Sequence, residues 1–315
     1  MPNRRFVLGS LLAAATAPLA PALAGAQSPA PSRIRIGITS ADNFAEGYYA
    51  QDAGFFAKAG LAVEIFGMAT GGQISTAVAG GAVDLGMSNT GQLANAIAHG
   101  APFVIVASGG LYNTAAPASA LVVAKDSPLR TAHDLEGKTC SVTALKDITQ
   151  IGPTAWMQRN GADSSKTRFV EIPFAEVAAA LDRGTIDAGM LAEPWLSSAN
   201  GTTVRVLGYV FDAIAPVFVL SPWFSTADYY RQNIDLVRRF ARAIYDTARW
   251  ANGHHPETAA ILAKYAKVDL AVLQRMNRSQ FATSLDPAQL QPILTMMYKY
   301  GAIDKPLAAE AIVAK

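Results

Sequence analysis

This chain carries the stretch Gly81-Ala82-Val83-Asp84-Leu85-Gly86-Met87 and, further on, the related stretch Gly184-Thr185-Ile186-Asp187-Ala188-Gly189-Met190. Both copies read Gly-x-(Val/Ile)-Asp-x-Gly-Met, and each follows an Ala-rich run with helical character. The leading glycine suits the end of a helix, where a left-handed backbone is most favourable without a Cβ atom. The next residues are typical of a short buried strand. Each copy therefore predicts one helix–strand unit of a parallel sheet, and two copies predict two similar lobes.

Strand and helix patterns alternate on both sides of each copy. Strands are predicted at 33–38, 61–66, 103–107, 121–123, 139–143, 168–172 and 204–207, and the pattern is almost wholly helical from 227 onward. This order predicts a two-lobed α/β protein in which each lobe is a mainly parallel sheet flanked by helices, with a helical C-terminal region. We expect lobe 1 to comprise residues 33–115 and 220–315, and lobe 2 residues 116–219, with hinge crossovers near 115–120 and 212–217.

The composition allows two domains of ordinary size. The 315 residues are 51% apolar and 16% charged, with a net charge of +2. Without a basic tract in the part after the N-terminal segment, the chain lacks the electrostatic pattern of a nucleic-acid-binding protein. The single cysteine, Cys140, lies in an apolar strand pattern, and we expect it in the core.

Residues 1–26 have the composition of an export signal rather than of a folded segment. Arg4-Arg5 precede an apolar, Ala-rich run, and Ala22-Leu23-Ala24 and Ala24-Gly25-Ala26 fit small-x-small cleavage sites. The paired arginines are typical of a twin-arginine signal, although an ordinary secretory signal can also carry two arginines. We therefore expect a periplasmic protein whose signal is cleaved near residues 24–26.

Four predicted helix starts share the spacing of a capping box, in which a polar side chain accepts a hydrogen bond from a free amide of the first turn. They are Asn43-x-x-Glu46, Thr70-x-x-Gln73, Asn89-x-x-Gln92 and Asp147-x-x-Gln150. Each follows a strand, and ligands of open α/β sheets bind where strands end and helices begin. Caps also stabilise helices without any ligand, so the prediction of a binding cleft depends on all four lying together.

The predicted ligand-binding residues are those at the strand ends and helix starts of both lobes. They are Asp42, Asn43, Phe44, Gly71, Gly72, Gln73, Ser88, Asn89, Thr90, Tyr112, Asn113, Asp147, Ile148, Thr149, Glu193 and Trp195. The aromatic rings of Phe44, Tyr112 and Trp195 could stack on a flat solute or could simply pack at the lobe surfaces. The side chain of Glu193 could equally serve as a helix cap.

The sequence shows no catalytic or metal-binding constellation. None of the four histidines lies near a predicted nucleophile or a carboxylate at metal-ligand spacing. Phosphate-loop and dinucleotide fingerprints are also missing, because Gly71-Gly72 alone is a weak signal. We expect neither a catalytic residue, nor a metal, nor a cofactor.

The segment Tyr48-x-Ala50-x-x-x-Gly54-Phe55-Phe56-x-x-x-Gly60-Leu61-x-Val63-Glu64 resembles the first helix and strand of ABC-transporter substrate-binding proteins of the nitrate/sulfonate/taurine type. The Gly-x-Val-Asp stretch, Asp134–Lys138 and the segment from Ile186 to Pro194 recur in that family in the same order. The resemblance spans roughly residues 33–250, and the family also contains thiamine-precursor-binding members. It implies the type II periplasmic-binding fold, with two α/β lobes and a double crossover.

The resemblance implies a protein that captures a small solute between its lobes by hinge closure and delivers it to the subunits of a membrane permease. Contacts that form only in the closed state shift the population towards that state. Two alternatives stay open. One is a biosynthetic enzyme of the pyrimidine-forming or menaquinone-pathway type, against which the export signal argues, and the other is a solute receptor for a membrane sensor. We expect a monomer that binds no nucleic acid.

The charges placed near the cleft predict the kind of solute. Asp42, Asp147 and Glu193 stand at predicted strand ends or helix starts, with Lys146 as the one nearby cation. Carboxylates repel an oxyanion and accept hydrogen bonds from amines and nitrogen heterocycles. This predicts a neutral or cationic, partly planar solute, provided that these carboxylates do not point away or serve only as caps.

Overall fold

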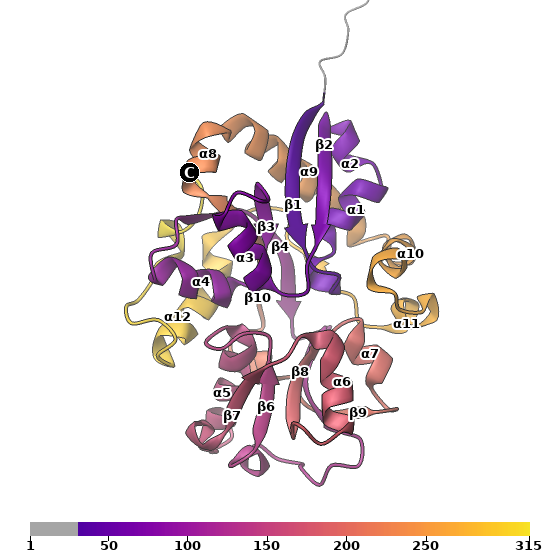
Figure 1. The fold of residues 1–315 in the computed structure, drawn as a ribbon, viewed down its shortest axis with the longest axis vertical. Helices are drawn as coiled ribbons and strands as arrows, with labels where there is room; N and C mark the ends of the chain where they lie inside the picture. The colour runs from indigo at the N-terminus through magenta and orange to yellow at the C-terminus, as the bar shows by residue number, and fades with distance from the viewer. Residues whose placement is uncertain (1–30) are drawn as a thin grey trace, which may run out of the picture. The chain divides into compact units, whose positions relative to one another are not determined.

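A computed structural model describes residues 31–315, so the predicted export signal at residues 1–26 lies outside the described part. The described residues form two sheets, drawn one above the other in Figure 1. The first sheet has the strand order β11–β4–β10–β3–β1–β2 and the second β7–β6–β8–β5–β9. The first comprises β1 (Ser32–Ile38), β2 (Leu61–Gly67), β3 (Leu85–Met87), β4 (Phe103–Asn113), β10 (Val217–Thr226) and β11 (Gln280–Phe281). The second comprises β5 (Ser119–Ala124), β6 (Thr139–Val142), β7 (Arg168–Glu171), β8 (Ala188–Ala192) and β9 (Val204–Gly208).

Helices connect the strands and make up most of the chain after β10, as the sequence predicted. They are α1 (Glu46–Asp52), α2 (Phe55–Lys58), α3 (Gly71–Ala79), α4 (Thr90–Ala98), α5 (Ile148–Arg159), α6 (Phe174–Asp182), α7 (Trp195–Ala199), α8 (Ala227–Gln232), α9 (Ile234–Ala251), α10 (His255–Ala266), α11 (Leu270–Arg275) and α12 (Gln291–Lys299). Within residues 31–315, none of these helices has the length and apolar character needed to cross a membrane. Cys140 is buried in the apolar core, as predicted.

Both sheets are mixed, so the prediction of mainly parallel sheets is wrong in this detail. In the first sheet β1 pairs in parallel with β2 and β3, while β10 runs antiparallel to β3 and β4. In the second, β6 pairs in parallel with β7 and β8, while β5 runs antiparallel to β8 and β9. The strands with antiparallel partners include the four that flank the two passages between the sheets. Local periodicity identifies strands but cannot show which distant strand each one joins.

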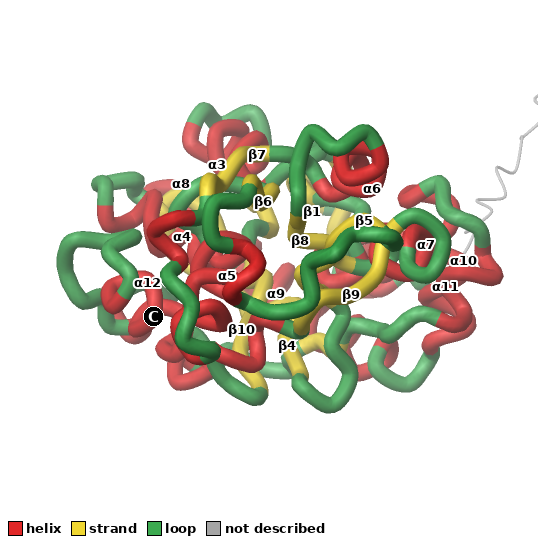
Figure 2. Tube along the Cα trace, turned by 90° about the horizontal axis from the view of Figure 1, so that it is seen from below, coloured by secondary structure: helices red, strands yellow, loops and turns green. Residues whose placement is uncertain are grey.

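The chain passes from β4 to β5 through residues 114–118 and returns from β9 to β10 through residues 209–216. Both passages overlap the predicted crossovers. The C-terminal helix α12 packs against both α4 and α5, which lie near it in Figure 2. Its Ile293 and Met297 share one apolar cluster with Ile148 and Ile151 of α5. The C-terminal region therefore contacts helices from both sheets, and the division of the chain into two moving lobes remains a proposal.

The two copies of the repeat adopt the same turn. α3 and α6 each end two residues before a left-handed glycine, Gly81 with a φ of 71° and Gly184 with a φ of 69°. In both copies the amide of this glycine and the amide after it donate to carbonyls in the last turn of the helix, at 2.9–3.1 Å. These bonds satisfy carbonyl groups that the end of a helix leaves free, and they turn the chain into the next strand.

The aspartate of each copy then joins its own strand segment to the neighbouring strand. Asp84 Oδ2 accepts a hydrogen bond from the amide of Arg35 at 2.7 Å, and Asp187 Oδ2 accepts one from the amide of Thr139 at 2.8 Å. The second glycine of each copy allows the helix to lie close to the strand. A Cβ atom at Gly86 would lie 2.4 Å from a methyl carbon of Ile74, and a Cβ atom at Gly189 would lie 2.8 Å from one of Val177.

Candidate functional site

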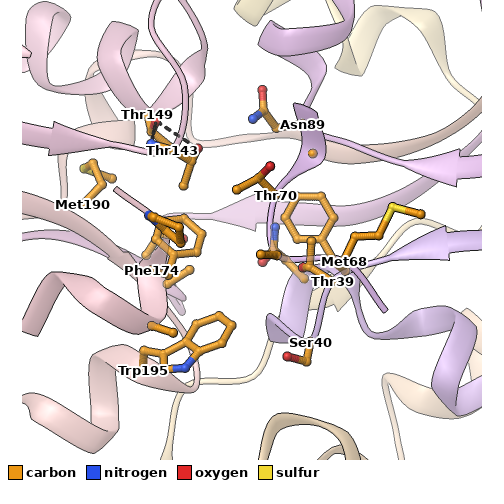
Figure 3. A pocket seen from close by; sticks show the side chains of 18 of the residues that line it. Thr39, Ser40, Met68, Thr70, Asn89, Thr143, Thr149, Phe174, Met190 and Trp195 are labelled. Carbon is orange, nitrogen blue, oxygen red and sulfur yellow. Dashed lines mark hydrogen bonds between the residues drawn. The ribbon is translucent and has the colours of Figure 1, made fainter. Parts of the chain in front are cut away.

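A cavity of about 320 Å³ lies between the two sheets, where strands end and helices begin (Figure 3). On the side of the first sheet it is lined by residues that follow β1, β2 and β3, namely Thr39, Ser40, Asn43, Phe44, Met68, Ala69, Thr70, Gly71 and Asn89. On the side of the second sheet it is lined by Ser119, Thr143, Ile148, Thr149, Pro173, Phe174, Ala175, Met190, Ala192 and Trp195. The volume suits a small organic molecule.

Five helices begin at this cavity, because the first residues or the caps of α3, α4, α5, α6 and α7 all line it. The first amides of a helix have no acceptor within the helix, and the aligned peptide dipoles place a partial positive charge there. The first-turn amides that are not bonded to a capping side chain can therefore donate hydrogen bonds into the cavity.

Three of the four predicted capping contacts are confirmed. Thr70, Asn89 and Asp147 each accept a hydrogen bond from an amide in the first turn of the helix that they precede, at 2.7–3.3 Å. These bonds fix the starts of α3, α4 and α5 at the cavity.

The fourth predicted cap, at Asn43, is wrong. Residues 42–44 form a short 3-10 helix, and the cap position of α1 falls to Ala45, whose methyl side chain cannot accept a hydrogen bond. Glu46 turns away from the cap into the core, where its Oε2 accepts a hydrogen bond from Nε1 of Trp223 at 2.8 Å. Burial raises the pKa of Glu46 well above its ordinary value, and the bond from Trp223 opposes that shift.

Apolar side chains form much of the cavity wall. Phe174 and Trp195 have ring centroids 6.1 Å apart, and Phe44 lines the cavity from the side of the first sheet. The third predicted stacking residue, Tyr112, is not a lining residue. Its ring packs on Phe218 with a centroid distance of 5.2 Å, and its hydroxyl donates to Asp212 at 2.6 Å.

Asp147 is buried behind the cavity wall with 1% of its surface exposed. Its carboxylate accepts hydrogen bonds from the hydroxyls of Thr149 at 2.6 Å and Thr143 at 3.0 Å, and from the amide group of Asn89 at 2.8 Å. Burial raises the pKa of Asp147, while the bonds from Thr149, Asn89 and Thr143 oppose that shift. The bond to Asn89 joins the start of α4 to the start of α5, and so links the two sides of the cavity.

Asp42 also faces away from the cavity. Its carboxylate accepts hydrogen bonds from Arg278 Nη2 at 2.8 Å, the Tyr49 hydroxyl at 2.8 Å and the Ser279 amide at 2.6 Å. Both members of the Arg278–Asp42 ion pair are buried, with 7% and 1% of their side chains exposed. The carboxylate of Asp42 therefore has its hydrogen-bond donors within the protein rather than in the cavity.

Glu193 is buried and turned back onto α7. The amide of Ser197 donates to its Oε2 at 3.0 Å, and the hydroxyl of Ser197 donates to its Oε1 at 2.8 Å. Burial raises the pKa of Glu193 to about 7, although the bonds from Ser197 lower it. The cap role considered for this residue therefore matches its contacts.

The structure brings part of the predicted site together at the cavity. The predicted residues that line it are Asn43, Phe44, Gly71, Asn89, Ile148, Thr149 and Trp195. The predicted residues that lie outside its lining are Asp42, Gly72, Gln73, Ser88, Thr90, Tyr112, Asn113, Asp147 and Glu193. All three predicted carboxylates belong to the second group, so the premise of the predicted preference for a neutral or cationic solute is wrong. A ligand-binding role for the lining residues stays a prediction.

Several lining residues were missed from the sequence. Thr39 and Ser40 follow β1, and Phe174 follows β7, so the rule that selected the other candidates could have found them. Tyr265, Ala266 and Lys267, at the end of α10, line the cavity without any local sequence signal. Among the lining residues of the described chain, Lys267 alone carries a charge.

Comparisons with known proteins find one matching family and similar folds that cover most of this chain. A family model described as "NMT1/THI5 like" matches residues 41–259. Comparison with curated protein sequences gives no match. Among solved structures, the alkanesulfonate-binding protein SsuA from Xanthomonas axonopodis pv. citri, bound to MOPS, has a TM-score of 0.75 and 18% identity, covering 91% of this chain and 99% of that chain. The periplasmic nitrate-binding protein NrtA from Synechocystis PCC 6803 has a TM-score of 0.76 and 15% identity, covering 91% of this chain and 86% of that chain.

An enzyme shares this fold as well. The desulfurization enzyme DSZB has a TM-score of 0.65 and 17% identity, covering 90% of this chain and 96% of that chain. At these identities the likeness shows the arrangement of sheets and helices, and it does not carry a ligand or a reaction from one protein to another.

Proposed function

Because this chain belongs to the NMT1/THI5-like family and has the fold of periplasmic binding proteins, we propose that it is the solute-binding component of an ABC importer. It captures a small organic solute in the cavity between the two sheets and delivers it to a membrane permease. With residues 1–26 as the export signal, its place of action is the periplasm.

One observation carries this proposal: a single cavity collects helix starts and apolar walls from both sheets. Backbone donors and hydroxyls such as that of Thr149 suit the polar atoms of a solute, and rings such as those of Phe44 and Trp195 suit its apolar body. A solute held there touches both sides at once. The alkanesulfonate-binding protein SsuA and the nitrate-binding protein NrtA share this fold, which supports solute capture as the role of such a cavity.

Hinge closure is the proposed mechanism. The two sides touch through the amide of Asp42, which donates to the carbonyl of Glu193 at 2.9 Å, and through the bond between Asn89 and Asp147. At Gly91 a Cβ atom would lie 2.7 Å from the backbone nitrogen of Ile148, so α4 and α5 approach closely. A solute that contacts both sides adds to these contacts only in the closed state, and it therefore favours closure.

Two other functions stay open as alternatives. One is a biosynthetic enzyme on the same fold, since an enzyme is among the structural neighbours. A receptor that presents the bound solute to a membrane sensor would use the same cavity and the same closure.

The experiment is native mass spectrometry of the protein isolated from its source without denaturant. We expect a bound small molecule that is released chemically unchanged. Ala175→Trp should abolish retention, because Ala175 is an exposed lining residue at the start of α6 and an indole there would fill the cavity. Ala179→Trp, at an exposed position of the same helix away from the cavity, is the matched control. Equal retention by both variants, or release of a converted product, would contradict the proposal.

A further inference from the structure

Lys267 occupies an unusual position in the cavity. It follows α10 and lines the cavity together with Tyr265 and Ala266, all beyond residue 259, where the match to the family model ends. Among the described lining residues it is the one charged side chain, whereas the carboxylates of Asp42, Asp147 and Glu193 are all bonded elsewhere. Lys267 is exposed to solvent, and its ammonium group is the one formal charge that the described lining residues carry.

The backbone conformation of Lys267 also supports a role in binding, independently of its charge. It caps the end of α10 in the left-handed conformation, with φ of 54° and ψ of 39°. This conformation is unfavourable for a residue with a Cβ atom, and glycine would adopt it more readily. Residues held in such conformations cluster at ligand sites, which supports a ligand-binding role for the side chain of Lys267.

The segment that carries Lys267 is anchored. The ring of Tyr265 stacks on Tyr48 with a centroid distance of 3.9 Å, and its hydroxyl donates to Asp52 Oδ1 at 2.7 Å. The neighbouring helix α11 packs against α7, which begins at Trp195. Figure 3 shows Trp195 and Ser40 at the end of the cavity opposite Asn89 and Thr149. The anchored segment therefore belongs to the Trp195 end.

We propose that Lys267 selects solutes that carry an acidic group, which its ammonium group holds at the Trp195 end while the apolar body lies against the aromatic wall. This inference rests on the proposed solute-binding function. It reverses the sign of charge that the sequence alone predicted, because the positions of side chains, rather than the number of nearby carboxylates, determine the charge that a ligand meets.

The test compares acids with their uncharged amides of nearly equal size: benzenesulfonate with benzenesulfonamide, and benzoate with benzamide. Binding to the mature chain is measured by calorimetry for wild type, Lys267→Met, Lys267→Arg and Lys267→Gly. Lys146→Met is the matched control, because Lys146 is also a left-handed lysine, with φ of 58°, but lies outside the lining.

We expect wild type to prefer the acids, and Lys267→Met to weaken acid binding about tenfold while changing amide binding less than twofold. Lys267→Arg should restore the preference for acids. Lys267→Gly should lose it although the glycine relieves the backbone, which separates the role of charge from any role in folding. Lys146→Met should behave as wild type.

The outcomes that contradict the inference are distinct from failure of the proposed function. If wild type binds the amides as well as the acids, or if Lys267→Met keeps the preference, Lys267 does not select acidic solutes although the cavity binds solutes. If none of the four compounds binds wild type, the inferred solute class is overturned, and native mass spectrometry decides separately whether the cavity holds a solute.

Discussion

The two copies of the Gly-x-(Val/Ile)-Asp-x-Gly-Met repeat share their framework but lead into different segments. Both use a left-handed glycine, an aspartate bonded to the neighbouring strand and a second glycine under the preceding helix. After the first copy, Asn89 caps the nine-residue helix α4 and lines the cavity. After the second, Glu193 turns back onto the five-residue helix α7, and Trp195 lines the cavity instead. The repeated residues therefore build the sheet, and the unrepeated residues after them build the site.

The largest effect on stability is expected at the second glycine of each copy, and comparing the two glycines tests whether the copies are structurally equivalent. We expect Gly86→Ala and Gly189→Ala each to lower the free energy of unfolding by about 3 kcal/mol, because the new methyl group would overlap the helix above the strand. Gly253→Ala is the control, since its nearest contact would be an ordinary 3.8 Å, and it should change stability by less than about 0.5 kcal/mol. Urea unfolding measures all three. A large loss at one repeat glycine and none at the other would break the equivalence.

The second largest effect concerns the residues that follow the two copies of the repeat. Glu193, after the second copy, titrates, whereas Asn89, after the first copy, does not. The pKa of Glu193 is raised by burial from 4.5 to about 7 in the folded chain. The folded chain therefore holds this proton at pH values where the unfolded chain has lost it. Its stabilising contribution is complete below pH 4.5 and declines as the pH rises towards 7. The decline between pH 5 and pH 7 amounts to about 2 kcal/mol.

Glu193→Gln should remove this part of the pH dependence, because the amide keeps an acceptor for the Ser197 amide and cannot ionise. Thermal unfolding at pH 5 and pH 7 compares this variant with wild type. Glu176→Gln, at an exposed position of α6, serves as the control and should leave the wild-type slope intact. An identical slope in wild type and Glu193→Gln would show that Glu193 does not titrate in this range.

The smallest effect concerns the repeat aspartates. Asp84→Ala and Asp187→Ala should each lower the free energy of unfolding by about 1 to 2 kcal/mol, because each leaves a strand amide without its carboxylate acceptor. Asp84 also forms an ion pair with Arg35 at 2.6 Å. Since 42% of the Arg35 side chain is exposed, that pair should add at most about 1 kcal/mol.

A double-mutant cycle with Arg35→Met measures this excess. In the Arg35→Met background the two aspartate variants should have equal effects. If Asp84→Ala still lowers the free energy of unfolding more than Asp187→Ala in this background, the two copies differ in the hydrogen bond to the neighbouring strand.

The sequence predicted the framework better than the site. Short-range patterns revealed the repeat, the strands and the caps at Thr70, Asn89 and Asp147, because those contacts join residues a few positions apart. The antiparallel pairing of β4 with β10 joins residues about a hundred positions apart, and no local pattern encodes it. Lys267 reaches the cavity only through the packing of α10, anchored by Tyr265 on Tyr48.

Charge was the least predictable property of the site. Asp42 stands directly after a strand, as a ligand residue would, but its partner Arg278 lies 236 positions away. Asp147 was identified as a cap, and the hydrogen bonds that make it a cap also keep it from lining the cavity. Both cases show that the position of a residue near a strand end does not determine the direction of its side chain.

In the proposed mechanism a solute closes the two sides of the cavity on each other, and the distance between one residue on each side tests this directly. Spin labels at Thr76→Cys on α3 and Ala179→Cys on α6 occupy exposed positions on the two sides, while the natural Cys140 is buried. Pulsed electron paramagnetic resonance then measures the distance between the labels, first in protein freed of its solute and then after the recovered solute is added back. We predict a broad distribution without solute and a single shorter distance with it. An unchanged distribution, with the solute shown to be bound, would contradict capture by closure.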